Sequence, residues 1–355
     1  MTVSFVDCSA DLLPSLREFL ARVYRPGYIL CRDERLFHWQ FGEATNGDGS
    51  AYHLKLALLD DQTVGCLGYV PVDVSLRGRI VPGVWLINWM VDPLQRQLGL
   101  GPLLMREVTG EFVVALNVGP NKDARDILSR MGWTDFGELA RYVCVLDVQA
   151  AGKLTRTGKL QWPAVAARLE KGHPVITTLV TSFGDDATQL WEAVWGRSAG
   201  TYRSAEFLNR RYAEHPTFKY RLHELRQKGR LRGLAVLRVE QVKDVSIRVG
   251  RILEFVSFPD VEEYLLQGVL DDALSQGVAV VDFFCSSRSM SEVMTQHGFL
   301  PGEDEAAAQL PTLFQPIDWK RQSIPFMAYL RNAPDALEVN DWYVTKGDGD
   351  QDRPN

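Results

Sequence analysis

The chain has 355 residues, of which 46% are hydrophobic and 24% are charged, with a net charge of -6 and a pI near 5.6. The hydrophobic content is ample for a packed core, and the length suggests two domains. The acidic balance, without a long Lys or Arg run, gives no support for nucleic-acid or membrane-surface binding, and no apolar run approaches the roughly 20 residues that span a bilayer.

The N-terminal residues have neither a basic region nor a long apolar stretch, so no signal peptide is predicted. The five cysteines are odd in number, widely scattered and without a CxxC pair. This usage is typical of reduced, mostly buried thiols, and we expect a cytoplasmic protein.

The first part of the chain mixes helix and strand patterns. A short strand is predicted at 3–6, an amphipathic helix at 12–23 and a second helix at 32–41. Breaks at 60–62 and 77–79 favour antiparallel hairpins between the strands that follow. Those strands are predicted at 53–59, 64–70, 72–76 and 80–91.

After Pro93 the apolar period becomes helical over 98–108, and an apolar strand follows at 112–118. The next predicted helix, 121–131, ends at Gly132. A strand at 141–148 then closes this first segment, and the Gly- and Thr-rich stretch after it predicts a linker.

Beyond the linker the pattern recurs at a constant spacing. Pro259 lies 166 residues after Pro93, and Gly298 lies 166 residues after Gly132. A constant spacing across several elements indicates a duplicated unit, although two unrelated α/β domains with similar periodicity remain an alternative. The predicted domains are a first unit at 1–149, a linker at 150–172, a second unit at 173–340 and a polar tail at 341–355.

The most informative stretch runs from Met90 to Gly101, where a strand leads directly into a helix. Arg96, Gly99 and Gly101 follow the pattern [RQ]-x-x-G-x-[GA]. With its flanking Val-x-Pro and apolar helix, this stretch resembles motif A of the GNAT acyltransferase superfamily. The Rossmann and Walker glycine patterns do not match it.

The motif has a physical reason. Unpaired N–H groups at a helix start form an anion site, glycines let a phosphate approach the backbone, and Arg96 adds a cation. We therefore expect acyl-CoA, either acetyl-CoA or a longer or hydroxylated acyl-CoA, as co-substrate, and no metal. The expected coenzyme-binding residues are Met90, Val91, Arg96, Gln97, Leu98, Gly99, Leu100, Gly101, Pro102, Asn121 and Ala124.

The resemblance also implies roles for the backbone. In GNAT folds the strand before the loop splays from its neighbour and exposes amides, here those of Trp89, Met90 and Val91, which polarise the thioester carbonyl. Asn121 and Ala124 resemble the N-x-x-A segment whose helix flanks the coenzyme arm.

Two family positions differ in this chain. Leu128 stands where many members carry a Tyr acid, and Trp85 stands where many carry a Glu base. The base must therefore come from elsewhere. The catalytic candidates are His38, Asn88, Trp89 and Glu254, with a surface histidine, a satisfied core amide and a buried ion pair as the alternatives for His38, Asn88 and Glu254.

The second unit has Glu262, Leu265 and Gln267 in place of the loop residues, and these would repel a pyrophosphate. We expect this unit to shape the acceptor pocket instead. The resemblance thus implies an α+β fold of two tandem GNAT-like units, each a mixed, mostly antiparallel sheet flanked by helices, with the second unit degenerate.

The expected acceptor is a small-molecule amine. The length, the paired units and the tail resemble two-unit GNAT enzymes that acylate nucleotide-linked (dTDP or UDP) amino sugars for surface polysaccharides. Tyr28 and Trp39 are candidates for stacking on the acceptor, although core packing is the alternative for both. If the tail folds back, Asp348 or Asp350 would lie at the amine; a disordered tail is the alternative.

Two other functions stay open. The missing Tyr and Glu suit an acyl-CoA sensor without catalysis. A tRNA-dependent aminoacyl transferase also pairs two such units, but the acidic pI and the intact loop argue against it. The chain is expected to act as a monomer or homodimer, with neither nucleic acid nor membrane as partner.

Overall fold

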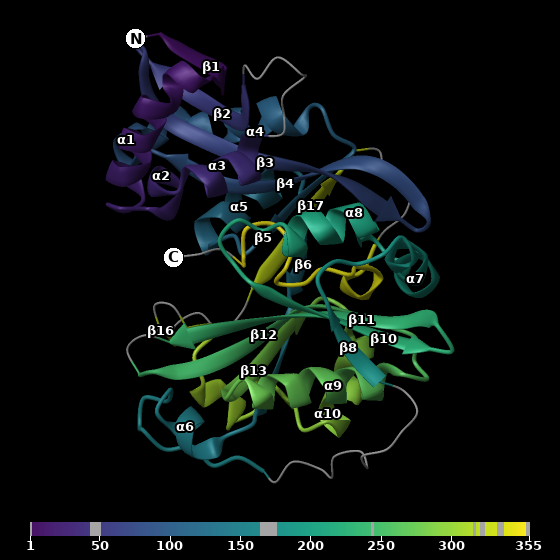
Figure 1. The fold of residues 1–355 in the computed structure, drawn as a ribbon. Helices are drawn as coiled ribbons and strands as arrows, with labels where there is room; N and C mark the ends of the chain where they lie inside the picture. Colours follow the sequence, from purple (N-terminus) through teal and green to yellow (C-terminus); the bar gives the residue numbers. More distant parts are fainter. Residues whose placement is uncertain are drawn as a thin grey trace.

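A computed structural model describes residues 2–42, 51–163, 176–242, 245–314, 317–319, 324–331 and 337–352. Figure 1 shows two units, one above the other, each built on a sheet with helices against it. The described residues include no helix that is both long and apolar enough to cross a membrane.

The first unit begins with a strand and three helices. The amphipathic helix α1 buries Leu16, Phe19 and Leu20 against the sheet, as its apolar spacing predicts. The predicted helix at 32–41 is split at Asp33, whose side chain accepts from the Leu36 N–H and caps α3. The helices and their leading strand are β1 (Val3–Cys8), α1 (Leu13–Val23), α2 (Ile29–Arg32) and α3 (Glu34–Phe41).

The sheet of this unit has the strand order β1-β2-β3-β4-β5-β17-β6, with β9 beside β3. Its centre is the long β3–β4 hairpin, which turns at Arg77 and Gly78, both with positive φ. The two strands predicted at 64–70 and 72–76 are one continuous strand. The remaining elements of the unit are β2 (Tyr52–Leu59), β3 (Gln62–Leu76), β4 (Arg79–Val91), η3 (Pro93–Leu98), α4 (Leu100–Thr109), β5 (Val114–Val118), α5 (Lys122–Arg130) and β6 (Thr134–Glu138).

The second sheet has the order β14-β7-β13-β12-β11-β10-β8. Its largest helix, α9, packs Leu265, Val269 and Ala273 into the core on one face. The main elements from β7 to the end of the chain, of which β9 and β17 pair in the first sheet, are β7 (Ala140–Val145), α6 (Val148–Gly152), β8 (Ile176–Val180), α7 (Asp186–Trp195), β9 (Gly200–Thr201), α8 (Ala205–Leu208), η4 (Asn209–Ala213), β10 (Tyr220–Gln227), β11 (Arg230–Val242), β12 (Ile247–Ser257), α9 (Glu262–Ser275), β13 (Val278–Cys285), α10 (Ser291–Gln296), β14 (Leu300–Pro301) and β17 (Pro325–Leu330).

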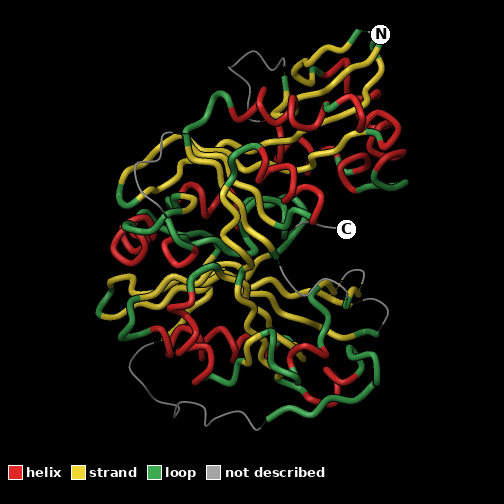
Figure 2. Tube along the Cα trace, turned by 180° about the vertical axis from the view of Figure 1, so that it is seen from behind, coloured by secondary structure: helices red, strands yellow, loops and turns green. Residues whose placement is uncertain are grey.

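The two sheets exchange strands. The strand β7, which was expected to close the first segment, pairs with β13 of the second sheet. In return β17, from the C-terminal part of the chain, lies between β5 and β6 of the first sheet. That expectation was wrong because an apolar strand pattern shows only that a strand is buried, and does not show which sheet takes it. Figure 2 shows the strands of both sheets meeting at the centre of the molecule.

The repeat in the sequence corresponds to a repeat in the structure. Strand β4 runs to α4 and then to β5, which pairs parallel to β4; β12, α9 and β13 follow the same course. Gly132 and Gly298, which close the helix that follows in each unit, both have positive φ, as a helix C-terminus favours.

The predicted linker is only partly described, since 164–172 lies outside the described residues. Its first part forms α6 and a turn in which Ala151 and Leu154 are fully buried against the second sheet. This part of the chain is therefore packed against the second unit.

Candidate active site

The loop after β4 is held by its own side chains. Asp92 caps the turn η3 by accepting from the Leu94 N–H at 3.0 Å, and Arg22 of α1 forms an ion pair with the same carboxylate. Hydrogen bonding to Arg22 lowers the pKa of Asp92. Gly99 then adopts φ +67 and starts α4, a left-handed conformation that favours glycine. The first N–H groups of α4 lack partners within the helix, as at any helix start, and the predicted anion site would use them.

Strand β4 carries an extra residue just before this loop. Ile87 pairs with Gly68 and Met90 with Cys66, so that Asn88 and Trp89 face a single residue of β3. Asn88 has φ +50, and its side-chain oxygen accepts a hydrogen bond from the Tyr28 hydroxyl at 3.1 Å. The bulge redirects the end of β4 next to the loop.

Strands β4 and β5 pair only from Gly83 to Trp85 and separate beyond Trp85. Just after the last pair, the Asn117 side chain donates to the Leu86 carbonyl at 3.0 Å. The edge of β4 that faces β5 is therefore unpaired near the bulge, as the resemblance implies for a strand that presents amides to a thioester.

A cavity of about 490 Å³ lies beside the end of β4. It brings together the end of α1, the end of β4, the glycine loop and the start of α5. Its lining residues are Val23, Tyr24, Trp89, Met90, Val91, Arg96, Gly101, Pro102, Asn121, Asp123, Ala124 and Ile127. Most of the expected coenzyme-binding residues thus meet at one cavity. Gln97, Leu98, Gly99 and Leu100 belong to the same loop without lining it, and Leu100 is buried in the core.

The sequence explains Gly101 by the approach of a phosphate, whereas the structure shows that the Trp89 ring packs against this position. A Cβ at this position would lie 3.1 Å from the Trp89 ring, whereas a Cβ at Gly99 would meet nothing within 4 Å. The Trp89 indole also donates to the Gly101 carbonyl at 3.2 Å. Trp89 therefore ties the strand to the helix start with its side chain, a role the sequence does not reveal.

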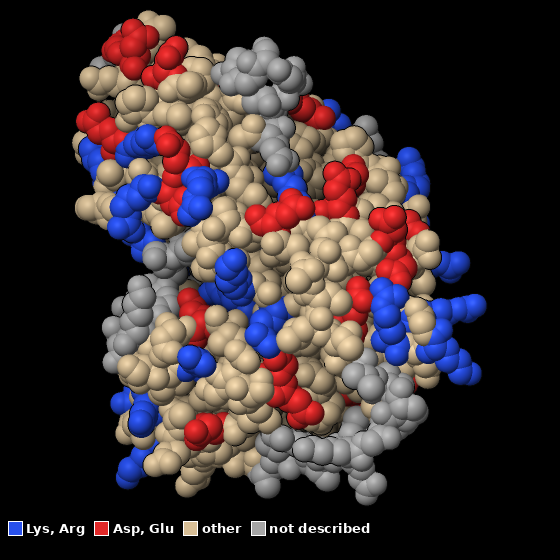
Figure 3. All heavy atoms as spheres, in the orientation of Figure 1, with Lys and Arg blue, Asp and Glu red and all other residues tan. Residues whose placement is uncertain are grey.

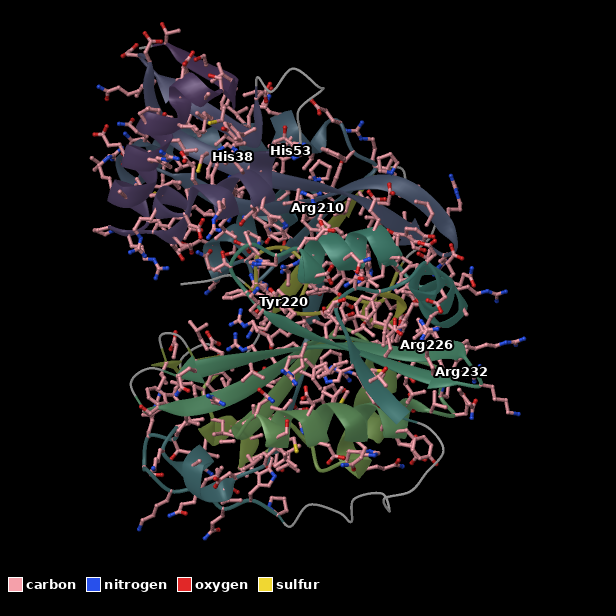
Figure 4. The ribbon with its side chains drawn as sticks, viewed as in Figure 1. His38, His53, Arg210, Tyr220, Arg226 and Arg232 are labelled. Atoms are coloured by element: carbon pink, nitrogen blue, oxygen red, sulfur yellow. The ribbon has the colours of Figure 1, made fainter. Side chains whose placement is uncertain are left out.

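A second, smaller cavity of about 90 Å³ lies beside β4 at the junction of the two units. Ile87 lines this cavity and Trp89 lines the larger one, with Asn88 between them. The second unit contributes Arg211 and His215. The full lining is Leu36, Trp39, Gln40, Val70, Pro71, Val72, Ile87, Phe207, Arg210, Arg211, His215, Gly349, Asp350 and Asp352. Figure 4 shows Arg210 and Tyr220 at this junction.

The expected acceptor residues fall into two groups. Trp39 and Asp350 line the small cavity, so the C-terminal tail does fold back to this site. Tyr28 is 1% exposed and supports Asn88 from the core. It therefore cannot stack on a ligand in this structure.

Asp348 and Glu254 are buried in a network that joins the units. Arg203, which is fully buried, donates to Asp348 at 2.6 Å and to Glu254 at 3.3 Å. The Trp85 indole reaches the same network, because it donates to Thr201, which donates in turn to Asp348. Tyr212 and Tyr343 also donate to Glu254. Burial raises the pKa of Glu254. The buried ion pair that the sequence left as an alternative is thus what the structure shows for Glu254.

His38 is exposed on α3 next to the Tyr52 ring and lines neither cavity. Figure 4 labels it in the first unit, away from Tyr220. Figure 3 shows the same face, with Lys and Arg atoms gathered beside the notch where the two units meet. Among the described residues, no group of three His, Cys, Asp or Glu side chains is arranged to hold a metal ion.

His215 is held as a neutral ring. Its Nδ1 accepts from the N–H groups of Thr217 and Phe218, at 3.2 and 3.0 Å, so the ring proton lies on Nε2. Burial lowers the pKa of His215 to about 3. Neither this histidine nor Arg211 was among the candidates, because no local motif marks them.

This depressed pKa predicts a pH dependence of stability. Below pH ~6.5 His215 binds a proton in the unfolded chain but stays neutral in the folded protein. The free energy of unfolding therefore decreases as the pH is lowered from ~6.5 to about 3. Between pH 7.5 and pH 5.0 His215 should lower the free energy of unfolding of the wild type by about 2 kcal/mol. Urea unfolding at both pH values checks this, with His215→Gln as control because glutamine still accepts from the amides and does not titrate. Equal losses in both proteins would contradict the assignment.

Solved acyltransferases share this fold. A GCN5-related N-acetyltransferase from Anabaena variabilis is 12% identical with a TM-score of 0.58, over 93% of this chain and 73% of that one. A probable N-acyltransferase of unknown function from Enterococcus faecalis is 12% identical with a TM-score of 0.60, over 93% and 72%. Saccharomyces cerevisiae N-myristoyltransferase with bound myristoyl-CoA is 12% identical with a TM-score of 0.57, over 97% and 89%.

These similarities establish the fold. The prediction of an α+β chain with two tandem GNAT-like units is confirmed. No protein-family model matches the sequence, and no curated protein is significantly similar to it.

Proposed function

We propose that this protein is a cytoplasmic N-acyltransferase that moves an acyl group from acyl-CoA to a primary amine. The observation that carries the proposal is the cavity of about 490 Å³ between the end of β4 and α5, which opens on the Arg96–Gly101 loop at a helix start. The pyrophosphate would bind the free N–H groups of α4 and Arg96. The pantetheine arm would lie along the unpaired edge of β4.

The proposed reaction is a direct attack in a ternary complex. The amine enters from the small cavity beside Ile87 and attacks the thioester carbon, which lies at the end of β4. Amides at the end of β4 stabilise the negative charge on the carbonyl oxygen. The C–N bond forms, the C–S bond breaks, and the proton lost by the nitrogen ends on the coenzyme thiol. Leu128 stands where many GNAT members carry the Tyr that acts as the acid. Tyr24 also places a phenol at the cavity, and it is our candidate proton donor to the thiolate.

For the acceptor, the sequence resemblance favours the amine of a nucleotide-linked (dTDP or UDP) amino sugar used in surface polysaccharide synthesis. Trp39, with its indole at the small cavity, would pack on the sugar ring. The enzyme would use no metal and would act as a monomer or homodimer.

The test is release of free thiol by the purified full chain with acetyl-CoA and longer or hydroxylated acyl-CoA. We expect release to depend on an added amine, and mass spectrometry to find the N-acylated product. Amines should include dTDP- and UDP-linked amino sugars, simple amines and amino acids. Tight CoA binding without release by any amine would count against acyl transfer.

A second candidate has its own observation. Leu128 and Trp85 fill the positions of the family's acid and base, and both are buried. This favours a protein that binds acyl-CoA without turnover, as a sensor. The same assay separates the two functions, because a sensor binds the coenzyme but releases no thiol.

A further inference from the structure

One wall of the small cavity carries Arg211, a buried cation with a hydrogen-bond donor left unused by the described residues. Arg211 is only 9% exposed, and its Nε donates to the Gly347 carbonyl at 3.0 Å. Its Nη1 is buried and has no hydrogen-bond partner among the described residues. A buried guanidinium with an unused donor is costly unless a ligand or water accepts from it.

The acid beside this cation is already engaged. Asp352 lines the cavity too, but one of its oxygens accepts from Arg238 at 2.5 Å and the other from Tyr220 at 2.8 Å. Asp352 acts on Arg211 through its charge, and neither of these two hydrogen bonds goes to Arg211. The donor on Arg211 remains for another anion.

His215 adds a second donor to the same wall. Since Nδ1 is used by two backbone amides, Nε2 carries the proton, and the residue lines the cavity. Its ring lies 4.4 Å from the Trp39 ring, and the Arg211 guanidinium lies 5.6 Å from the same indole. Both side chains therefore contact the Trp39 ring, and the Arg211 charge also acts on the His215 ring, whose pKa it helps to lower. Two donors at one wall would suit the two oxygens of a carboxylate.

The other walls are mixed. Apolar contacts come from Leu36, Val70, Val72 and Ile87, while Asp350 supplies a negative charge, and Gln40 and Arg210 also line the cavity. A negative group together with a donor wall complements a molecule that carries both an ammonium and an anion. Because one water needs about 10–15 Å³ in the same measure, a cavity of about 90 Å³ holds roughly six to nine non-hydrogen atoms.

We infer that this cavity binds a small amino acid as the acyl acceptor, with its carboxylate on Arg211 and His215 Nε2–H, its amine toward Ile87 and its side chain on the apolar wall. The inference rests on the proposed acyl transfer, and it replaces the nucleotide sugar as acceptor. A nucleotide is much larger than the cavity, whereas a carboxylate satisfies the buried donor directly.

The experiment compares amines that differ only by a carboxylate. Alanine, valine and leucine, as both enantiomers, are assayed beside ethylamine, 2-methylpropylamine and 3-methylbutylamine, with acetyl-CoA and the full chain. We expect at least one amino acid to exceed its decarboxylated partner in kcat/KM by about 100-fold or more, with an N-acyl amino acid as product.

Arg211→Met should reduce that preference to within about threefold. Arg232→Met, a surface arginine paired with Asp260, is the control and should leave the preference unchanged. The wild-type comparison stands even if Arg211→Met does not fold.

The outcomes separate the two proposals. Turnover of amines regardless of a carboxylate, or of nucleotide-linked amino sugars alone, overturns the amino-acid inference and leaves acyl transfer intact. Thiol release by no amine at all, despite CoA binding, overturns acyl transfer itself. An unchanged preference in folded Arg211→Met would also overturn the assignment of the carboxylate site.

Discussion

Replacing Gly101 with leucine is expected to weaken CoA binding by about 30-fold or more, which corresponds to about 2 kcal/mol. Gly101 lines the larger cavity at the start of α4, where the pyrophosphate would meet the helix N–H groups. A Cβ there would come within 3.1 Å of Trp89, so the larger side chain would move the indole and fill the space beside the free amides. Isothermal titration with CoA measures the effect.

The fold should survive this change. Leucine is a strong helix former, and position 101 lies in the first turn of α4. Leu103→Ala is the matched control, because Leu103 lies on the same helix, is 41% exposed and does not line the cavity. If a folded Gly101→Leu protein binds CoA as tightly as the control, the assignment of the anion site to this helix start is wrong, and the main argument for acyl transfer fails.

The second large effect is expected at the junction of the units. Arg203→Met should lower the free energy of unfolding by about 3–5 kcal/mol, because it leaves the buried carboxylates of Asp348 and Glu254 without their cation. Asp348 belongs to the C-terminal tail and Glu254 to β12, so the loss should also loosen the tail at the small cavity. Urea unfolding followed by circular dichroism measures this loss in the free energy of unfolding.

Arg232→Met provides the comparison for this experiment as well. Its ion pair with Asp260 is solvent-exposed, and such pairs are worth about 1 kcal/mol or less. Equal effects of the two substitutions would show that the Arg203 network contributes no more than a surface pair.

Much of the first unit could be predicted because its signals are local. The apolar spacing of α1, the turn at Arg77 and Gly78, and the glycines of the loop each act within a few residues. The Arg96–Gly101 loop belongs to this class, since a helix start and two glycines define the chemistry that we expect of it. These local residues are enough to predict the anion site, but they do not indicate that Trp89 packs on Gly101.

The rest depends on contacts between distant parts of the chain. Strand β7 has the same apolar pattern whether it joins the first or the second sheet, and only tertiary packing decides. The small cavity unites Trp39 with Arg211 and Asp350, from α3, the second unit and the tail. Glu254 could be predicted as a buried carboxylate, but its partner Arg203 could not, since no spacing rule links them.

The exchange of β7 and β17 has a consequence for the order in which the protein can form. While the chain is being synthesised, the first sheet lacks the strand between β5 and β6 until residue 330 has been made. The early half then exposes unpaired strand edges, which are sites of wrong association. The first sheet therefore cannot be completed until nearly the whole polypeptide has been synthesised.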